Sequence, residues 1–243
     1  MSIIDTSANL NLWRRKSLAE KSLLALGMLL IAIAVPSWVS ALAVAVIMTA
    51  ATLLGARVPP GVWSRVVTAP VGFLIAGAAG VALQIHHGHL GLAPQGLGLA
   101  GHLAARALAG VSCLLFLALT TPAADLIAGM RRIGVPAEIA EMALLMYRFL
   151  FLLTGTAEAM NTAQGARLGH SSYRRHMRSL GLLIANLMPR ALARARALEI
   201  GLAARGWRGE LRVLSPVRRA SVGAIAAIAL LELAVLALGL RTL

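Results

Sequence analysis

The run "LAGHLAARALAGVSCLLFLALTTPAADLIAGMRR" (residues 99–132) decides the class of fold. Between Leu99 and Thr121 it is mostly apolar and carries one formal charge, at Arg106. A helix needs about 20 mostly apolar residues to cross a bilayer, so this segment predicts a membrane span. Arg131 and Arg132 follow it, and Lys and Arg collect at the cytoplasmic ends of spans. The span is therefore expected to end on the cytoplasmic side.

The whole chain has the composition of a membrane protein. Of its 243 residues, 59% are hydrophobic and 13% are charged, with a mean hydropathy of +0.81; a soluble domain carries about 25% charged residues. The net charge of +14 indicates that the chain contacts anionic lipid or an acidic protein partner, or that its Lys and Arg residues set the membrane topology. Cys113, the only cysteine, lies in an apolar run and is expected to be a buried core residue. We predict an all-α, polytopic membrane helical bundle in the cell (inner) membrane.

The distribution of charge predicts the topology. The turn at Pro36-Ser37 and the loop 86–98 carry no Lys, Arg, Asp or Glu, whereas the region 122–220 holds 15 of the 21 arginines. One arrangement satisfies every loop: a cytoplasmic N-terminus, five spans and an outer C-terminus. The other four spans are expected at 23–35, 38–54, 66–85 and 220–240. The expected organisation is four N-terminal spans in 1–121, a cytoplasmic or interfacial region in 122–219 and a last transmembrane helix in 220–243.

The segment "IAEMALLMYRFLFLLTG" (139–155) has nearly the length of a span, but Glu141 and Arg148 interrupt it. Its open interpretations are a sixth crossing, a re-entrant helix and a helix lying at the membrane interface. A sixth crossing would put residues 167–205, with their arginines, outside. We therefore favour the last two interpretations.

Two helices are predicted to end in an arginine shortly before a glycine. Residues 177–205 form one long helix with Gly206 as its stop, and about 149–167 form another that ends before Gly169. Pro189 should kink or break the longer helix, because it lacks an N–H and clashes with the preceding turn. An apolar stripe recurs along this helix at steps of three and four residues: Leu180, Ile184, Leu187, Ala191, Ala195, Leu198 and Leu202.

The arginines at these helix ends, Arg167 and Arg205, have two interpretations. Each lies in a last turn, where the helix dipole favours a cation. It either extends into anionic lipid headgroups or docks its planar fork on a carboxylate of a partner. The small residues Ala203, Ala204 and Gly206 would let a partner approach closely. Spacing alone does not decide between the two.

Several motifs follow one another along the chain. They are Thr-Thr-Pro (120–122), Gly-x-Pro (134–136), Tyr-Arg-Phe (147–149), "AQGARLG" (163–169) and "PRALARARALEIGLAARGWRG" (189–209). In combination they resemble the transmembrane T component of energy-coupling factor transporters, and most closely its cobalt/nickel subtype. These transporters are ATP-driven importers of vitamins and transition metals. The resemblance extends from about Lys16 to Leu240.

The resemblance implies a coupling role for the arginine-ended helices. In this family two long cytoplasmic coupling helices cross like an X, and each ends in an Ala-Arg-Gly-type motif that inserts into one of two ATP-binding cassette ATPase subunits. The matching residues are Ala166-Arg167 and Ala204-Arg205-Gly206. In the first motif Leu168 stands where Gly is expected, and the Gly falls at 169. The implied partners are the two ATPases, a substrate-binding membrane component and membrane lipid, with no nucleic acid, resident metal or cofactor.

Other polar residues have less specific interpretations. Arg106 and Glu232 lie at similar depths in their spans, roughly 20 Å from the inner ends at 1.5 Å per residue. We predict that they form an intramembrane ion pair. In the alternative, Arg106 extends outward and Glu232 faces a partner subunit or is protonated. Arg148 is expected to hydrogen-bond to a helix end or to Glu141, or to contact the substrate-binding component. The histidines of the outer loop are interpreted as solvated, with a transient metal contact as the alternative: His86, His87 and His89.

The predicted function is the T subunit of an importer of transition-metal ions, with cobalt preferred. The chain itself is not expected to be an enzyme, because it has no Gly-rich phosphate loop followed by Lys-Ser/Thr. A T component of a nickel or vitamin importer is the nearest alternative, followed by a conventional ABC permease, whose loop motif fits poorly here. A membrane-embedded transferase would need clustered carboxylates for Mg²⁺, and the chain has nine acids and no Asp pair. A basic nucleic-acid binder is disfavoured because few aromatic residues lie among the arginines.

Overall fold

The computed structural model describes residues 3–86, 89–92, 96–206 and 220–242. The chain divides into two compact units, residues 1–126 with 216–243 and residues 127–215. The described residues are almost entirely helical, which confirms the predicted all-α class. One feature was not predicted: β1 (Leu83–His86) pairs antiparallel with β2 (His89–Leu92). This short hairpin lies where the end of the third span and a loop were expected.

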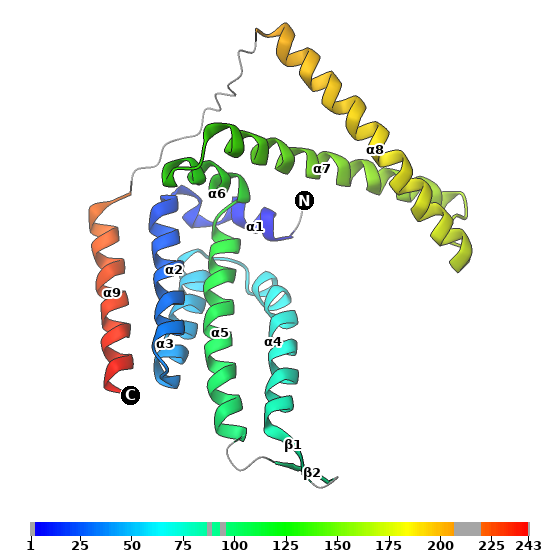
Figure 1. The fold of residues 1–243 in the computed structure, drawn as a ribbon. Coiled ribbons are helices and arrows are strands. Elements are labelled where there is room, and N and C mark those ends of the chain that lie inside the picture. The colour runs from blue at the N-terminus through cyan, green and yellow to red at the C-terminus, as the bar shows by residue number, and fades with distance from the viewer. Residues whose placement is uncertain (1–2, 87–88, 93–95, 207–219, 243) are drawn as a thin grey trace. The chain divides into compact units, whose positions relative to one another are not determined.

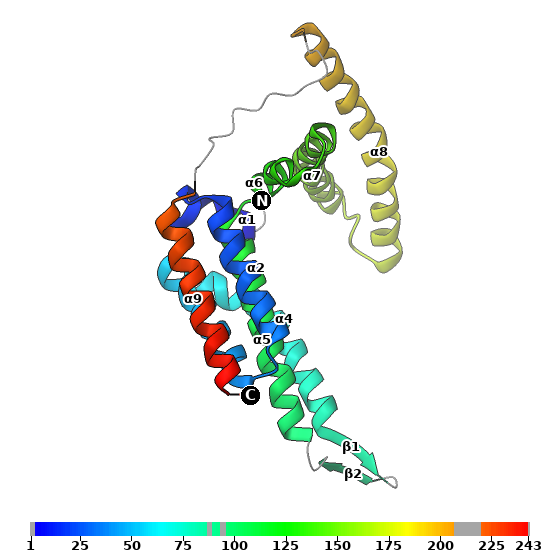
Figure 2. The same ribbon diagram turned by 60° about the vertical axis from the view of Figure 1, so that its left-hand side comes forward.

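A bundle of helices forms the first unit, and Figures 1 and 2 show α2, α3, α5 and α9 side by side in it. Its elements are α1 (Ile3–Leu10), the 3-10 turn η1 (Leu12–Arg15), α2 (Leu18–Ala34), α3 (Trp38–Ala50), the π-helical turn η2 (Ala51–Gly55), α4 (Pro60–Ala82), α5 (Gly96–Thr120) and α9 (Val222–Arg241). Met28, Val44, Met48 and Phe116 fill its core together with Cys113, whose burial confirms the prediction.

Five helical segments of the described residues are long and apolar enough to cross a membrane: Trp38–Gly55, Pro60–Ala82, Gly96–Thr120, Ala137–Ala166 and Val222–Arg241. Four of them match predicted spans. The fifth, α7 (Ala137–Ala166), contains the ambiguous segment 139–155. The predicted span 23–35 falls in α2, which has only 17 residues. α2 nevertheless packs against α3, α5 and α9 within the bundle.

The second unit is a pair of long helices, reached through α6 (Ala123–Met130) and η3 (Arg131–Ile133). α7 runs unbroken through both segments that were predicted separately, 139–155 and 149–167. α8 (Tyr173–Ala204) follows after a short turn and packs against α7. Of the predicted kink or break at Pro189, the break is wrong, because α8 is continuous through this residue. Pro189 and Ala185, whose carbonyl loses its donor, are both exposed, and solvent can satisfy that carbonyl.

The apolar stripe predicted along α8 is only partly packed within the chain. Leu187, Ala191, Leu198 and Leu202 are half-buried, whereas Leu180, Ile184 and Ala195 are exposed. Ser179 and Leu183 are the buried residues near the start of the helix. Near the start of α8 the packed residues Ser179, Leu183 and Leu187 recur in steps of four, and each such step turns about 40° around a helix with 3.6 residues per turn. The line of contact therefore begins beside the predicted stripe and joins it at Leu187.

Candidate functional site

The end of α8 has the geometry that its sequence predicts. Arg205 caps the helix, and Gly206 follows with φ +71°, in the left-handed region. The N–H of Arg205 donates to the carbonyl of Leu202 at 3.1 Å, and that of Gly206 donates to the carbonyl of Ala203 at 3.0 Å. Gly adopts this conformation without a steric penalty, so Gly206 ends the helix and Arg205 projects from its last turn.

The end of α7 repeats this backbone although its sequence departs from the motif. Arg167 caps the helix with φ −95°, close to the −91° of Arg205. Leu168 then takes the left-handed position with φ +57°. Its N–H donates to the carbonyl of Gly165 at 3.0 Å, and the N–H of Gly169 donates to that of Gln164 at 2.9 Å, which together form a Schellman motif. Leu168 therefore stands where Gly206 stands, at a steric cost on the order of 1–3 kcal/mol.

Gly169 is required at its position by close packing. A Cβ atom there would lie 2.6 Å from Ser179 Oγ and 2.8 Å from the carbonyl oxygen of Gln164. The Ser179 hydroxyl donates to the carbonyl of Gly169 at 3.2 Å. Ser179 and Gln164 thus pack tightly around Gly169 in the turn between α7 and α8. This packing fixes the position of Arg167 at the end of α7.

Both arginine side chains are exposed. Among the described residues, the ion pairs of Arg14 with Asp125 and of Arg131 with Glu141 involve neither Arg167 nor Arg205. A guanidinium group is a planar fork that suits a carboxylate or phosphate. Each helix end therefore presents an arginine that has no acidic partner among the described residues.

A cleft of about 280 Å³ lies beside Arg205, between α7 and α8. Two more arginines line it, Arg148 of α7 and Arg194 of α8. The predicted bond of Arg148 to a helix end or to Glu141 stays a prediction; Glu141 lies 3.9 Å from Arg131 in the ion pair described above. Sequence reasoning did not bring Arg194 together with Arg148. The two are 46 positions apart, and only the packing of the helices joins them.

The predicted ion pair between Arg106 and Glu232 is not formed. Arg106 donates to the backbone carbonyls of Ala32, at 3.3 Å, and Ile33, at the C-terminal end of α2. These carbonyls belong to the last turn of a helix, where intrahelical donors are missing, and the long arginine side chain can reach them. Glu232 instead packs on Gly27 of α2, where an added Cβ would lie 2.0 Å from its Oε1 atom. The alternative of an outward-extending Arg106 is the one that the contacts support.

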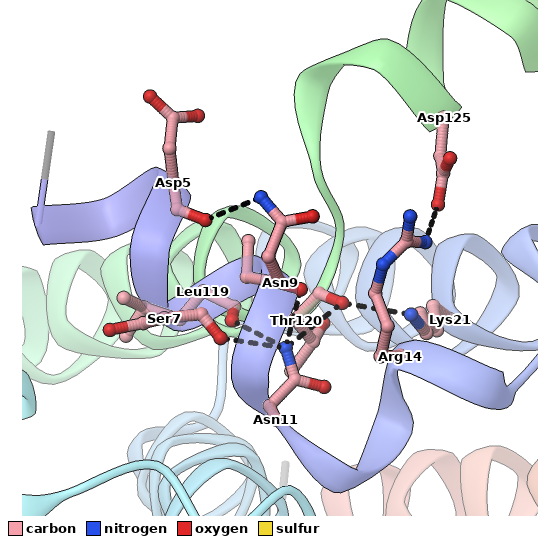
Figure 3. Close-up of polar contacts among 10 residues, drawn as sticks. Asp5, Ser7, Asn9, Asn11, Arg14, Lys21, Leu119, Thr120 and Asp125 are labelled. Carbon is pink, nitrogen blue, oxygen red and sulfur yellow. Dashed lines mark hydrogen bonds and ion pairs between the residues drawn. The ribbon is translucent and has the colours of Figure 1, made fainter. Parts of the chain in front are cut away.

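A polar cluster that sequence reasoning missed joins the start of the chain to the end of α5 (Figure 3). Lys21 is 1% exposed, and its Nζ donates to the carbonyl of Thr120 at 2.8 Å. Asn11 donates through Nδ2 to the carbonyl of Leu119 at 3.1 Å. Arg14 pairs with Asp125, which lies in the first turn of α6. The cluster fixes the point where the chain leaves the bundle for the second unit.

The side chains of the outer-loop histidines lie outside the part of the chain that the structure describes. His86 and His89 are backbone partners at the end of the β1–β2 hairpin, and His87 lies outside the described residues. Among the described residues, no group of three or more His, Cys, Asp or Glu side chains is placed to hold a metal ion. The metal contact considered for this loop therefore stays a prediction.

Comparison with known proteins places the chain in a family. The family model CbiQ, described as "Cobalt transport protein", matches residues 11–215. The "Cobalt transport protein CbiQ" of Rhodobacter capsulatus is 53% identical over 236 residues, covering 97% of both chains. The "Uncharacterized protein MJ1089" of Methanocaldococcus jannaschii is 30% identical over 251 residues, covering 99% of this chain and 94% of its own. A "Putative fused cobalt transport protein CbiMQ" of Methanocorpusculum labreanum is 28% identical over 219 residues, covering 85% of this chain and 37% of its own.

These matches agree with the architecture described above. Helices of membrane-spanning length suit a multi-pass membrane protein, and both arginine-ended helices, α7 and α8, lie within the matched residues. The chain belongs to the CbiQ family of cobalt transport proteins.

Proposed function

We propose that the chain is the transmembrane coupling subunit, or T component, of an ATP-driven importer of transition-metal ions, with cobalt as the ion. The observation that carries this proposal is the repeated helix end. α7 and α8 finish in the same backbone conformation, each with an exposed arginine that lacks an acidic partner in the described residues. Two equivalent docking points suit two similar ATPase subunits.

The proposed mechanism is mechanical. ATP binding closes the two ATPases on each other, and Arg167 and Arg205 carry that movement into α7 and α8. The helices pass it to a substrate-binding membrane component, which reorients in the bilayer. The exposed apolar residues of α8 include Leu180 and Ile184, and they support packing against such a component. In this proposal the N-terminus and both helix ends are cytoplasmic and the membrane is the inner membrane.

The names of the relatives support cobalt and a membrane partner. The matched relatives of Rhodobacter capsulatus and Methanocorpusculum labreanum are named as cobalt transport proteins. The chain covers 37% of the second, whose name describes a fusion. A separate partner that corresponds to the rest of that longer chain would supply substrate recognition. Uptake of radioactive cobalt, in competition with nickel and with a vitamin, measures the substrate preference in cells that express the complete transporter.

Co-purification in detergent tests the docking proposal. The tagged chain is expressed with its candidate ATPase and substrate-binding component, as wild type, Arg167→Glu, Arg205→Glu and the double variant. We expect each single change to weaken ATPase retention and the double change to abolish it. Arg174→Glu, a charge reversal at the exposed start of α8, is the matched control and should retain the ATPase. Equal retention by all variants, with every sample monodisperse, would show that the helix ends do not dock an ATPase.

A further inference from the structure

The cleft beside Arg205 is lined by two further arginines that the docking proposal does not involve. Three guanidinium groups line it, Arg148 from α7 and Arg194 and Arg205 from α8. All three side chains are exposed at its rim. Two arginines of this set were not part of either helix-end motif, and they come from different helices. The cleft exists because α7 packs on α8, and its shape depends on that packing.

The charge of the cleft is not balanced by the described part of the chain. None of its lining residues is acidic. The nearest acid to Arg148 along α7 is Glu141, which pairs with Arg131. The three positive charges around this small space repel one another. A bound anion would offset that repulsion, because each guanidinium group attracts it. The arrangement therefore favours a negatively charged group in the cleft.

The lining and the size restrict what that group can be. Between the arginines the cleft is lined by apolar or small residues: Phe149, Leu152, Ala197, Leu198, Gly201 and Leu202. Its volume of about 280 Å³ lies just below the range of roughly 300–1,000 Å³ typical of small-molecule sites. A single acidic side chain with an apolar neighbour fits this combination better than a nucleotide does.

We propose that Arg148 and Arg194 form, with Arg205, a carboxylate-binding cleft that receives an acidic side chain of an ATPase subunit. This inference rests on the proposed function, and it names the chemistry of one docking point. It also makes the two helix ends unequal. The α8 end binds through three guanidinium groups from two helices, whereas Arg167 at the α7 end does not line this cleft. Docking at α8 then depends on the packing of α7 against α8 as well as on Arg205.

Binding measurements on the intact chain test the proposal. The full chain is placed in nanodiscs of zwitterionic lipid, and the affinity of the purified ATPase is measured for wild type, Arg148→Glu, Arg194→Glu and Arg205→Glu. The matched control is Arg196→Glu, which reverses an exposed charge on the same helix but does not line the cleft. We expect Arg148→Glu and Arg194→Glu each to weaken binding about tenfold or more. Arg196→Glu should change it less than about twofold, since exposed charges contribute little.

Conservative variants separate the binding role from a folding role. Arg148→Lys keeps the charge without the planar fork and should lose less affinity than Arg148→Gln. Each variant must remain monodisperse with unchanged helical content. If Arg196→Glu loses as much ATPase affinity as the cleft variants, the proposed carboxylate-binding cleft is wrong and the ATPase is attracted only by the overall positive charge.

The remaining outcomes distinguish this inference from the proposed function. If Arg205→Glu weakens binding while Arg148→Glu and Arg194→Glu behave like Arg196→Glu, docking stands and the three-arginine cleft is wrong. If Arg205→Glu also binds like wild type, the docking proposal itself fails. Retention of phosphatidylglycerol by wild type and its loss from Arg148→Glu in native mass spectrometry, with ATPase affinity unchanged, would assign the cleft to lipid instead. Glu210 lies outside the described residues, and tighter ATPase binding by Glu210→Gln would identify the chain's own acid as the occupant.

Discussion

The residue after each helix-ending arginine determines how that arginine is presented. Gly206 and Leu168 both adopt left-handed backbone conformations, with φ +71° and +57°. Each places the preceding arginine in the last turn of its helix, where the negative end of the dipole stabilises a cation. Leu adopts this conformation only at a steric cost. The backbone at Leu168 therefore resembles that at Gly206 although the residue is not a glycine.

Exchanging the residue types at these two positions should change stability in opposite directions. Leu168→Gly removes a steric cost on the order of 1–3 kcal/mol but adds about 0.5–1 kcal/mol of unfolded-chain entropy. A small net stabilisation is expected. Gly206→Ala introduces a side chain at positive φ and should cost about 1 kcal/mol. Thermal unfolding in detergent, followed by circular dichroism, measures both; shifts in the same direction would contradict the left-handed assignment at one of the two sites.

A second residue-scale prediction concerns Gly169. Gly169→Ala would bring a methyl group within 2.8 Å of the carbonyl oxygen of Gln164. Since this neighbour is backbone, the turn must shift, and a loss on the order of 1–3 kcal/mol is expected. Gly181→Ala is the control, because nothing lies within 4 Å of the added atom. In the interior of α8 it should stabilise the chain by up to about 1 kcal/mol. Equal effects of the two changes in thermal unfolding would show that the turn is not tightly packed.

At the scale of elements, the start of the chain holds the end of α5. The carbonyls of Leu119 and Thr120 lie in a last helical turn, which leaves them without intrahelical donors. Asn11 and Lys21 supply those donors across about a hundred residues of sequence. A buried lysine is rare unless its charge is satisfied. The contact therefore secures the helix that leads from the membrane bundle into the arginine-rich unit.

Removing the Lys21 donor should destabilise the bundle. Lys21→Met keeps most of the side-chain volume but leaves the carbonyl of Thr120 without this donor, at a cost of about 1–3 kcal/mol. Lys16→Met is the matched control: Lys16 is exposed and lies 4.9 Å from the ring centroid of Trp13, a contact of about 0.5–1 kcal/mol. The two variants are compared by thermal unfolding in detergent. A Lys21→Met effect no larger than that of Lys16→Met would mean that the buried contact adds nothing.

Features that depend on neighbouring residues could be predicted from the sequence, whereas contacts between distant segments could not. Four of the candidate spans, the burial of Cys113 and the stop at Gly206 depend on local composition, and these were predicted. The contacts of Lys21 with Thr120 and of Arg106 with Ala32 join distant segments, and no local pattern indicates them. Arg106 shows the limit most clearly. Equal depth suggested a pair with Glu232, but depth does not give the rotation of a helix about its axis. The three-arginine cleft escaped prediction for the same reason.

At the scale of the whole molecule, the bundle constrains what α7 can do. Ser221 donates its N–H to Glu20 at 2.8 Å, so α9 begins at the end of the bundle where Lys21 contacts Thr120 and α5 ends. At the opposite end Ser37 and Thr242 share a hydrogen bond of 2.6 Å. The chain therefore leaves the bundle after α5 and returns to it before α9 at the same end. A crossing by α7 alone would need a second crossing to return.

α8 is a poor candidate for that second crossing. It is not among the described helices that are apolar enough to span a membrane, and six arginines lie within it: Arg174, Arg175, Arg178, Arg190, Arg194 and Arg196. Each would cost about 2.5–3.5 kcal/mol at the centre of a bilayer on insertion scales. The length and apolarity of α7 are then better explained by a helix that lies at the interface or re-enters the same side. We therefore propose that the bundle crosses the membrane with α2, α3, α4, α5 and α9.

Labelling with a membrane-impermeant maleimide distinguishes five crossings from six. Cys113 is buried and should not react in wild type, which leaves single introduced cysteines as reporters at Asn9, Ala193 and Thr242, all exposed. With five crossings and a cytoplasmic N-terminus, Thr242→Cys reacts on intact cells, whereas Asn9→Cys and Ala193→Cys react only after permeabilisation. In a six-crossing topology, which would also have to break the contacts of Ser221 with Glu20 and of Ser37 with Thr242, Ala193→Cys reacts on intact cells and Thr242→Cys is protected. That result would place Arg205 outside, where no cytoplasmic ATPase could reach it.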